Sequence, residues 1–181
     1  MVEAALPELI LLSEYDGNWE LYLDAIYQNY LGEVINAKLH HNKLPVKFQF
    51  RPEHQGKGFA FWHAISEGEK EDNRTIDFRR CERIKWIAWV IKNALTSDKI
   101  TSWENKRGKN QHVVLFFEGE SYVVILAKRN NYYLFKTAYC ATPQRKRQLI
   151  KERKEYFLAR TLERLKAPIR TPSDAPSTHG R

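Results

Sequence analysis

The chain has little cysteine and no long apolar run. Its two cysteines, Cys81 and Cys140, lie far apart among 181 residues and match no zinc-ligand spacing. Each sits in an apolar pattern, so we expect two reduced core thiols and no disulfide. No apolar run approaches the roughly 20 residues of a membrane-spanning helix, and residues 9–12 are too short for a signal sequence. We therefore expect a soluble, cytoplasmic protein without a membrane partner.

Basic side chains are absent from one end of the chain. Residues 1–36 hold seven Asp or Glu and no Lys or Arg, whereas residues 143–170 hold ten Lys or Arg and three acids. The whole chain has a formal net charge of +8. This asymmetry favours a polyanion such as RNA as the partner of the basic end. The alternative is that the acidic and basic ends pack against each other.

Three segments have the spacing of helices. Residues 18–35 repeat apolar side chains every three or four positions, after a turn with a possible N-cap at residues 16–18. Residues 78–95 follow Asp77, which suits the N-cap position. Residues 142–166 begin with a Thr-Pro pair, which suits the N-cap and first helical positions. The first helix is acidic and the last is strongly basic.

Four segments have the composition of strands, namely residues 46–51, 113–118, 122–128 and 132–140. The last three are joined by short turns, which predicts an antiparallel meander. Residues 59–65 suggest a strand or an extended crossing segment, and residues 103–110 suggest a basic loop. The predicted fold is α+β, with an antiparallel four-stranded sheet and the 78–95 helix packed on one face.

The sequence predicts one domain followed by a tail. The domain spans residues 1–166, with an acidic helical segment at 1–40, a core at 45–140 and a basic helix at 142–166. Residues 167–181 are rich in Pro, Ser and Thr, so we expect them to be disordered.

One stretch suggests phosphoryl chemistry. His63 lies in an apolar run, and four arginines follow it, namely Arg74, Arg79, Arg80 and Arg83. Imidazole moves protons near neutral pH, and guanidinium groups hold phosphate oxygens. The alternative is a core histidine beside a solvated helix face. Carboxylates at residues 67–72 could hold Mg²⁺, but they crowd one loop, so we expect no metal and no other cofactor.

The motifs as a set resemble a known superfamily. They are Gly56-Lys57-Gly58, Phe61-Trp62-His63, the segments 77–84 and 122–126, and the segment 133–139. Together they resemble the phage-type branch of the barnase, EndoU, colicin-tRNase and RelE-like ribonucleases, over about residues 45–140. The resemblance implies helices followed by a curved four-stranded antiparallel sheet, and RNA cleavage without metal, often by a toxin. The acidic N-terminal and basic C-terminal helices are not part of that shared core.

The resemblance implies a set of site residues. Its histidine, its arginine or lysine, and its terminal-strand Ser, Thr or Tyr fall here on His63, on Arg79 or Arg83, and on Thr137 with Tyr139. Two apart on a strand, Thr137 and Tyr139 should share one face, together with Tyr133 and Phe135. Further basic residues are candidates for binding RNA, namely Lys57, Arg74, Arg80, Lys136, Arg145, Lys146 and Arg147.

The expected activity is that of a metal-independent endoribonuclease of phage or toxin type. Its partners would be RNA and an antitoxin or immunity protein. Two alternatives from other classes stay open. The chain could be a nucleic-acid-binding or phage-related regulatory module that cuts nothing, or an adaptor with no role on nucleic acid.

Overall fold

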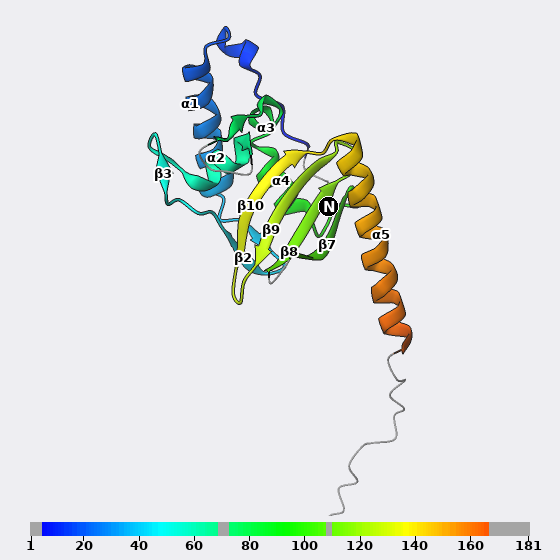
Figure 1. Ribbon diagram of the computed structural model, residues 1–181. Coiled ribbons are helices and arrows are strands. Elements are labelled where there is room, and N and C mark those ends of the chain that lie inside the picture. Colours follow the sequence, from blue (N-terminus) through cyan, green and yellow to red (C-terminus); the bar gives the residue numbers. More distant parts are fainter. Residues whose placement is uncertain (1–4, 69–72, 108–109, 167–181) are drawn as a thin grey trace, which may run out of the picture.

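The computed structural model describes residues 5–68, 73–107 and 110–166, and it has an α+β fold built on a curled mixed sheet (Figure 1). The sheet has six strands in the order β1-β2-β10-β9-β8-β7. Their bounds are β1 His40–His41, β2 Leu44–Lys47, β7 Ile100–Arg107, β8 Asn110–Phe117, β9 Tyr122–Lys128 and β10 Tyr133–Cys140. Two short hairpins lie outside it, formed by β3 Glu53–His54 with β4 Lys57–Gly58 and by β5 Ser66–Glu67 with β6 Thr75–Ile76.

Helices cover both faces of the sheet. The described residues form α1 Trp19–Asn29, α2 Phe59–Ile65, α3 Phe78–Glu82, α4 Trp86–Asn93 and α5 Pro143–Lys166, with a 3₁₀ turn η1 Leu12–Tyr15 and a π-helix η2 Tyr30–Ile35. The helices α1 to α4 share one apolar core with alternate residues of β8, β9 and β10. Leu149 of α5 packs with Trp103, Val114 and Phe116 on the opposite face. The acidic helix α1 and the basic helix α5 therefore lie on opposite faces and do not pack together (Figure 1).

The helix starts follow from side-chain caps. Asn18 accepts a hydrogen bond from the backbone N–H of Leu21, and Asp77 accepts one from Arg79. Thr142 accepts one from the backbone N–H of Arg145. Each cap satisfies a donor that the first helical turn leaves unpaired. The predicted starts of the helices at 18–35, 78–95 and 142–166 are confirmed.

Three predicted elements are wrong in detail. Residues 59–65 are helical, because Ala60, Phe61, Ala64 and Ile65 form a buried stripe at helical spacing. The 78–95 helix is two helices, α3 and α4, separated by a turn at residues 83–85. The basic segment at 103–110 belongs largely to the edge strand β7, where charged side chains suit the exposed side of an edge.

The sheet itself also differs from the prediction. The meander of 113–118, 122–128 and 132–140 is confirmed as β8, β9 and β10, and its fourth antiparallel strand is β7. The predicted strand at 46–51 is the shorter β2, and it pairs with β10 in parallel. The long stretch between β2 and β10, which contains α2, α3 and α4, supplies the crossover that a parallel pair needs. The purely antiparallel four-stranded sheet is therefore replaced by a mixed sheet.

Both cysteines are buried and unpaired, as predicted. The predicted tail at 167–181 lies outside the described residues. Within the part of the chain that the structure describes, no helix is both long enough and apolar enough to cross a membrane.

Candidate functional site

The face of the sheet that carries α5 also carries a cavity of about 640 Å³. Four of its lining side chains are cationic, two are histidines and one is acidic. The lining residues are His63, Glu67, Gly68, Arg74, Arg80, His112, Ile125, Lys136, Thr137, Tyr139 and Arg145. They come from α2, the β5–β6 hairpin, α3, β8, β9, β10 and α5. We call this the basic cavity.

A β-bulge at Lys136 sets which side chains of β10 enter the basic cavity. Phe135 pairs with Leu126 and Thr137 pairs with Ile125, so Lys136 is the extra residue. The bulge changes the face on which the later residues of the strand lie. Thr137 and Tyr139 consequently line the cavity, whereas Tyr133 and Phe135 are buried in the core under α1 to α4. The expectation that all four share one face is wrong.

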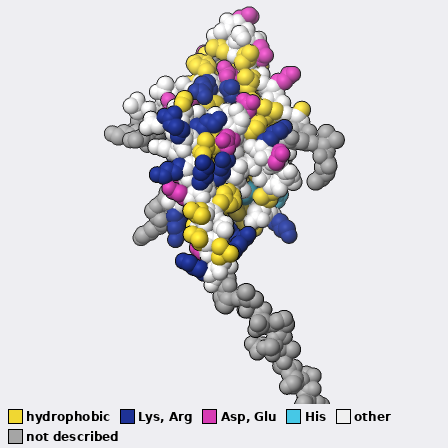
Figure 2. Space-filling view, turned by 90° about the vertical axis from the view of Figure 1, so that its right-hand side faces the viewer, with side chains coloured by type: hydrophobic (Ala, Val, Ile, Leu, Met, Phe, Trp, Pro, Cys, Tyr) yellow, Lys and Arg dark blue, Asp and Glu magenta, His cyan; other side chains and the backbone are white. Residues whose placement is uncertain are grey.

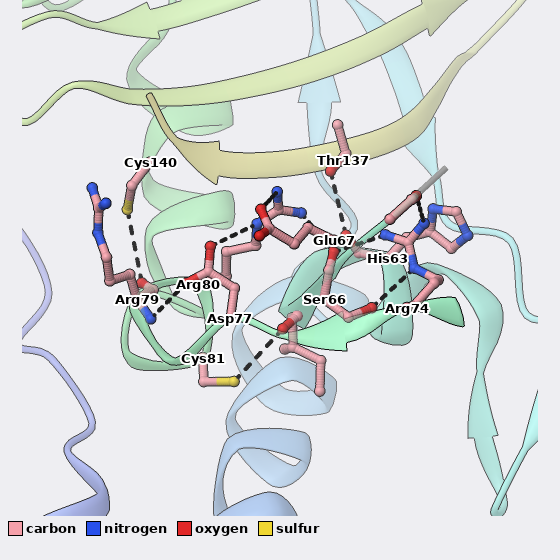
Figure 3. A network of polar contacts seen from close by, with 12 residues as sticks. His63, Ser66, Glu67, Arg74, Asp77, Arg79, Arg80, Cys81, Thr137 and Cys140 are labelled. Carbon is pink, nitrogen blue, oxygen red and sulfur yellow. Dashed lines mark hydrogen bonds and ion pairs between the residues drawn. The ribbon is translucent and has the colours of Figure 1, made fainter. Parts of the chain in front are cut away.

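His63 reaches the basic cavity from α2. Its ring lies against the ring of Phe59, one helical turn earlier, with 4.1 Å between the centroids. The hydroxyl of Thr137 donates a hydrogen bond of 3.3 Å to the backbone carbonyl of His63. That bond joins α2 to β10 at the cavity wall (Figure 3).

Arg74 and Arg80 converge on one buried residue, Ser66. Nη2 of Arg74 and Nη1 of Arg80 both donate to the Ser66 carbonyl, at 2.7 and 2.6 Å, and Nε of Arg74 donates to the Ser66 hydroxyl at 3.0 Å (Figure 3). Arg80 also pairs with Asp77 at 3.2 Å and with Glu67 at 3.4 Å. The side chain of Glu67 is 63% exposed, so an anion could replace it beside Arg80.

Arg145 enters the basic cavity from the first turn of α5. Its Nε donates to the hydroxyl of Tyr139 at 3.3 Å, and its Nη1 donates to Glu152 at 2.8 Å. Its buried Nη2 has no hydrogen-bond partner among the described residues. Burial alone would lower the pKa of the guanidinium, but hydrogen bonds to Tyr139 and Glu152 raise that pKa, so Arg145 stays charged. The guanidinium carbon of Arg80 lies over the ring of Tyr139, 5.8 Å from its centroid.

The structure brings seven of the predicted site residues to the basic cavity and leaves five elsewhere. Those in the cavity are His63, Thr137, Tyr139, Arg74, Arg80, Lys136 and Arg145. Those outside it are Arg79, Arg83, Lys57, Lys146 and Arg147.

The two arginines predicted to be catalytic do not line the basic cavity, although Arg79 is the second residue of α3 and Arg83 is its C-cap. Arg79 is exposed, and its carbonyl accepts a weak hydrogen bond from the thiol of Cys140, which Figure 3 shows on the other side of Arg80 from His63. Arg83 pairs with Glu82 at 2.9 Å and lies over the ring of Trp86.

The remaining predicted bases have other neighbours. Lys57 pairs with Asp24 at 3.1 Å, and Lys146 donates to the carbonyl of Glu118 at 2.8 Å. Arg147 is exposed on α5. The five predicted residues outside the basic cavity therefore do not form one site with His63.

His112, the second histidine of the basic cavity, was not among the predicted site residues. It lies on β8, two residues before Val114, and Val114 packs under α5. The alternation His112, Val114, Phe116 places the histidine on the same face as those buried residues. That signal was present in the sequence, but the strand was predicted to begin after it.

The predicted carboxylate loop contributes two described residues, Glu67 and Gly68, to the basic cavity, and only Glu67 of these carries a carboxylate. Residues 69–72 lie outside the described part of the chain. Among the residues that are described, no three His, Cys, Asp or Glu side chains form a group that could hold a metal ion. The four cationic side chains of the cavity are suited to binding an anion, and two imidazoles line the same cavity.

The two cysteines, Cys81 and Cys140, do not line the basic cavity. Burial, with a smaller contribution from Asp77, raises the pKa of the Cys81 thiol to about 12. Burial also raises the pKa of Cys140. Both are therefore protonated at neutral pH and are poor nucleophiles.

Comparison of the chain with protein families, with curated proteins and with solved structures finds no match in any of the three.

Proposed function

We propose that the chain is a metal-independent endoribonuclease whose active site is the basic cavity. The observation that carries this proposal is the meeting of His63 and His112 with four cationic side chains in one cavity. Two imidazoles can supply a base and an acid, and fixed cations can stabilise the charge of a phosphorane.

The reaction would be an internal transesterification of RNA. One histidine takes the proton of the ribose 2′-hydroxyl, and the 2′-oxygen forms a bond to phosphorus. The bond from phosphorus to the 5′-oxygen breaks, and the second histidine donates a proton to that leaving oxygen. The products are a 2′,3′-cyclic phosphate and a 5′-hydroxyl, so atoms and protons balance without a metal or an added water.

Lys136 and Arg145 are the best candidates for holding the phosphate. Lys136 is exposed at the bulge and forms no hydrogen bond or ion pair with the other described residues. Arg145 is charged, and its buried Nη2, which carries two N–H donors, has no hydrogen-bond partner among the described residues. Arg80 would join them if phosphate replaced Glu67. These three take the role that the sequence assigned to Arg79 or Arg83.

The arrangement of the elements supports the proposed resemblance to the barnase, EndoU, colicin-tRNase and RelE-like ribonucleases. Four consecutive antiparallel strands, β7 to β10, follow the helices α1 to α4, as in that superfamily. We propose on this basis a cytoplasmic enzyme of toxin or phage origin, and an antitoxin or immunity protein as its regulator.

A nucleic-acid-binding module without catalysis is the second candidate, and one observation favours it. The face that carries α5 gathers Lys and Arg side chains beside hydrophobic ones (Figure 2). Arg147, Lys151, Lys154, Arg160 and Arg164 are exposed along that helix, outside the basic cavity. Such a surface would bind RNA or DNA through phosphate contacts alone.

Incubation of the purified protein with total RNA in EDTA separates these functions. Wild type should release fragments that end in a cyclic phosphate, and His63→Ala should lose about 10²–10⁴-fold in rate while it still binds RNA. His40→Ala is the matched control, because His40 is exposed on β1 and does not line the cavity. Cleavage that survives His63→Ala would remove the active-site assignment. Cleavage that EDTA abolishes would indicate a metal nuclease.

A further inference from the structure

A second hollow, of about 500 Å³, adjoins the basic cavity. Its apolar lining comprises Pro52, Phe59, Trp62 and Ile76, and His54 and Arg74 lie at its wall. We call it the aromatic hollow. It is formed by α2, the β3–β4 hairpin and the β5–β6 hairpin.

The two cavities share a wall. Arg74 lines both of them. Phe59 lines the aromatic hollow, His63 lines the basic cavity, and their rings lie 4.1 Å apart between centroids with planes 30° apart. A group bound beside His63 would therefore lie close to the aromatic hollow.

The rings of the aromatic hollow are held in place. Nε1 of Trp62 donates to the carbonyl of His54 at 3.0 Å, and the rings of Trp62 and His54 meet edge to face with 5.4 Å between centroids. Arg74 is fixed by its bonds to Ser66 and to the carbonyl of Gly68. A flat ligand would meet preformed surfaces, which reduces the entropy lost on binding.

We infer that the aromatic hollow binds one unpaired nucleobase of the RNA whose phosphate lies in the basic cavity. Every base has a π-face that can stack on an aromatic side chain, and single-stranded RNA presents such bases next to its phosphates. A double helix keeps its bases stacked, so the inferred substrate is a single-stranded region. This inference rests on the proposed function, because the hollow is a base site only if a ribose phosphate lies beside it.

Binding of a probe that cannot be cut tests this inference separately from catalysis. The probe is a short fluorescein-labelled 2′-O-methyl oligonucleotide of mixed sequence, and its partner is the same chain with abasic residues. Both carry the same phosphate charge. Wild type should bind the probe with bases about 5- to 150-fold more tightly than the abasic probe, which is the range for stacking of one base.

Substitution of the hollow should remove that difference. Phe59→Leu and Trp62→Leu should bind the probe with bases more weakly, and should bind the abasic probe as wild type does. Phe50→Leu is the matched control, because Phe50 is 49% exposed and its carbonyl accepts a hydrogen bond from the N–H of Phe59, but it does not line the hollow. Thermal melts of each variant show whether it is folded. Trp62→Phe keeps an aromatic ring, so it should retain part of the preference for the probe with bases.

The results of these binding and cleavage experiments distinguish the base site from the ribonuclease activity. Equal binding of both probes by wild type would overturn the base site, even if RNA is cleaved. A base preference that Phe59→Leu and Trp62→Leu both retain would also overturn it. A base preference lost in these two variants, with no cleavage of RNA, would support the base site and reject the ribonuclease.

Discussion

The hydroxyl of Thr137 donates a hydrogen bond of 3.3 Å to the backbone carbonyl of His63. The two residues are 74 positions apart, and their contact fixes α2 against β10 at the wall of the basic cavity. The bulge at Lys136 makes this contact possible, because it places Thr137 on the opposite face of the strand from Phe135, which is buried in the core. Thr137 is therefore a positioning residue for His63 in the proposed site.

The first prediction concerns this bond. Thr137→Val keeps the shape of the side chain but removes the donor, so it should cost about 0.5–1.5 kcal/mol of unfolding free energy. If His63 transfers a proton, kcat should fall several-fold while KM changes little. Thr137→Ser should restore kcat. Measurement of both parameters on RNA checks this, and a change in KM alone would contradict the positioning role.

The second prediction separates the bases inside the basic cavity from those outside. Lys136→Gln should slow RNA cleavage by about 10²-fold, the cost of losing one group that stabilises transition-state charge. Arg79→Gln is the matched control, because Arg79 is exposed and does not line the cavity. Slow cleavage by Arg79→Gln together with unchanged cleavage by Lys136→Gln would instead assign the phosphate contact to Arg79.

Local patterns predicted the elements of the fold better than the composition of the site. Caps such as Asp77 and Thr142 and the continuous apolar run of β9 act over a few residues, so the sequence shows them directly. The bulge at Lys136 depends on pairing with β9 and leaves no local pattern. For that reason Thr137 and Tyr139 were correctly placed on one face, but Tyr133 and Phe135 were wrongly placed with them.

Long-range packing decides the remaining differences. The helical form of α2 depends on the burial of Ala60, Phe61, Ala64 and Ile65 against other elements, which a seven-residue apolar segment does not reveal. His63 on α2 and His112 on β8 line the same cavity, although they are far apart in the sequence. Only the folded structure shows that they are neighbours. Of the four arginines after His63, Arg74 and Arg80 line the cavity, where both donate to the carbonyl of Ser66, a contact that the sequence does not show.

The third prediction concerns the thiols. Because burial raises the pKa of both Cys81 and Cys140, neither forms much thiolate at neutral pH. In the native protein both should react slowly with a disulfide reagent that absorbs light on reaction. In denaturant two thiols should react rapidly. Rapid reaction of one thiol in the native protein would contradict the burial of that residue.

The fourth prediction concerns stability in mild acid. Burial lowers the pKa of His41, whose ring packs edge to face on Tyr133. The unfolded chain therefore takes up this proton more readily than the folded chain. His41 therefore makes its whole contribution to the free energy of unfolding above its ordinary pKa of about 6.5. That contribution is lost as the pH falls below this value.

Urea unfolding at several pH values measures this effect. Wild type should lose stability between about pH 7.5 and pH 5.5, around the ordinary histidine pKa. His41→Leu should lose less over the same interval. His40→Leu, which changes the exposed neighbouring residue, should keep the wild-type slope. Identical slopes for all three proteins would contradict the assignment.

The last prediction divides the work between His63 and His112. A general acid matters most when the leaving oxygen is basic, since it must be protonated as the bond breaks. A ribonucleoside 3′-phosphodiester with a nitrophenol leaving group needs little protonation. On RNA, both His63→Ala and His112→Ala should lose about 10²–10⁴-fold. On the nitrophenyl ester, the variant that lacks the base should lose as much, whereas the variant that lacks the acid should retain most of its activity. Equal losses for both variants on the two substrates would show that the histidines do not act as separate base and acid.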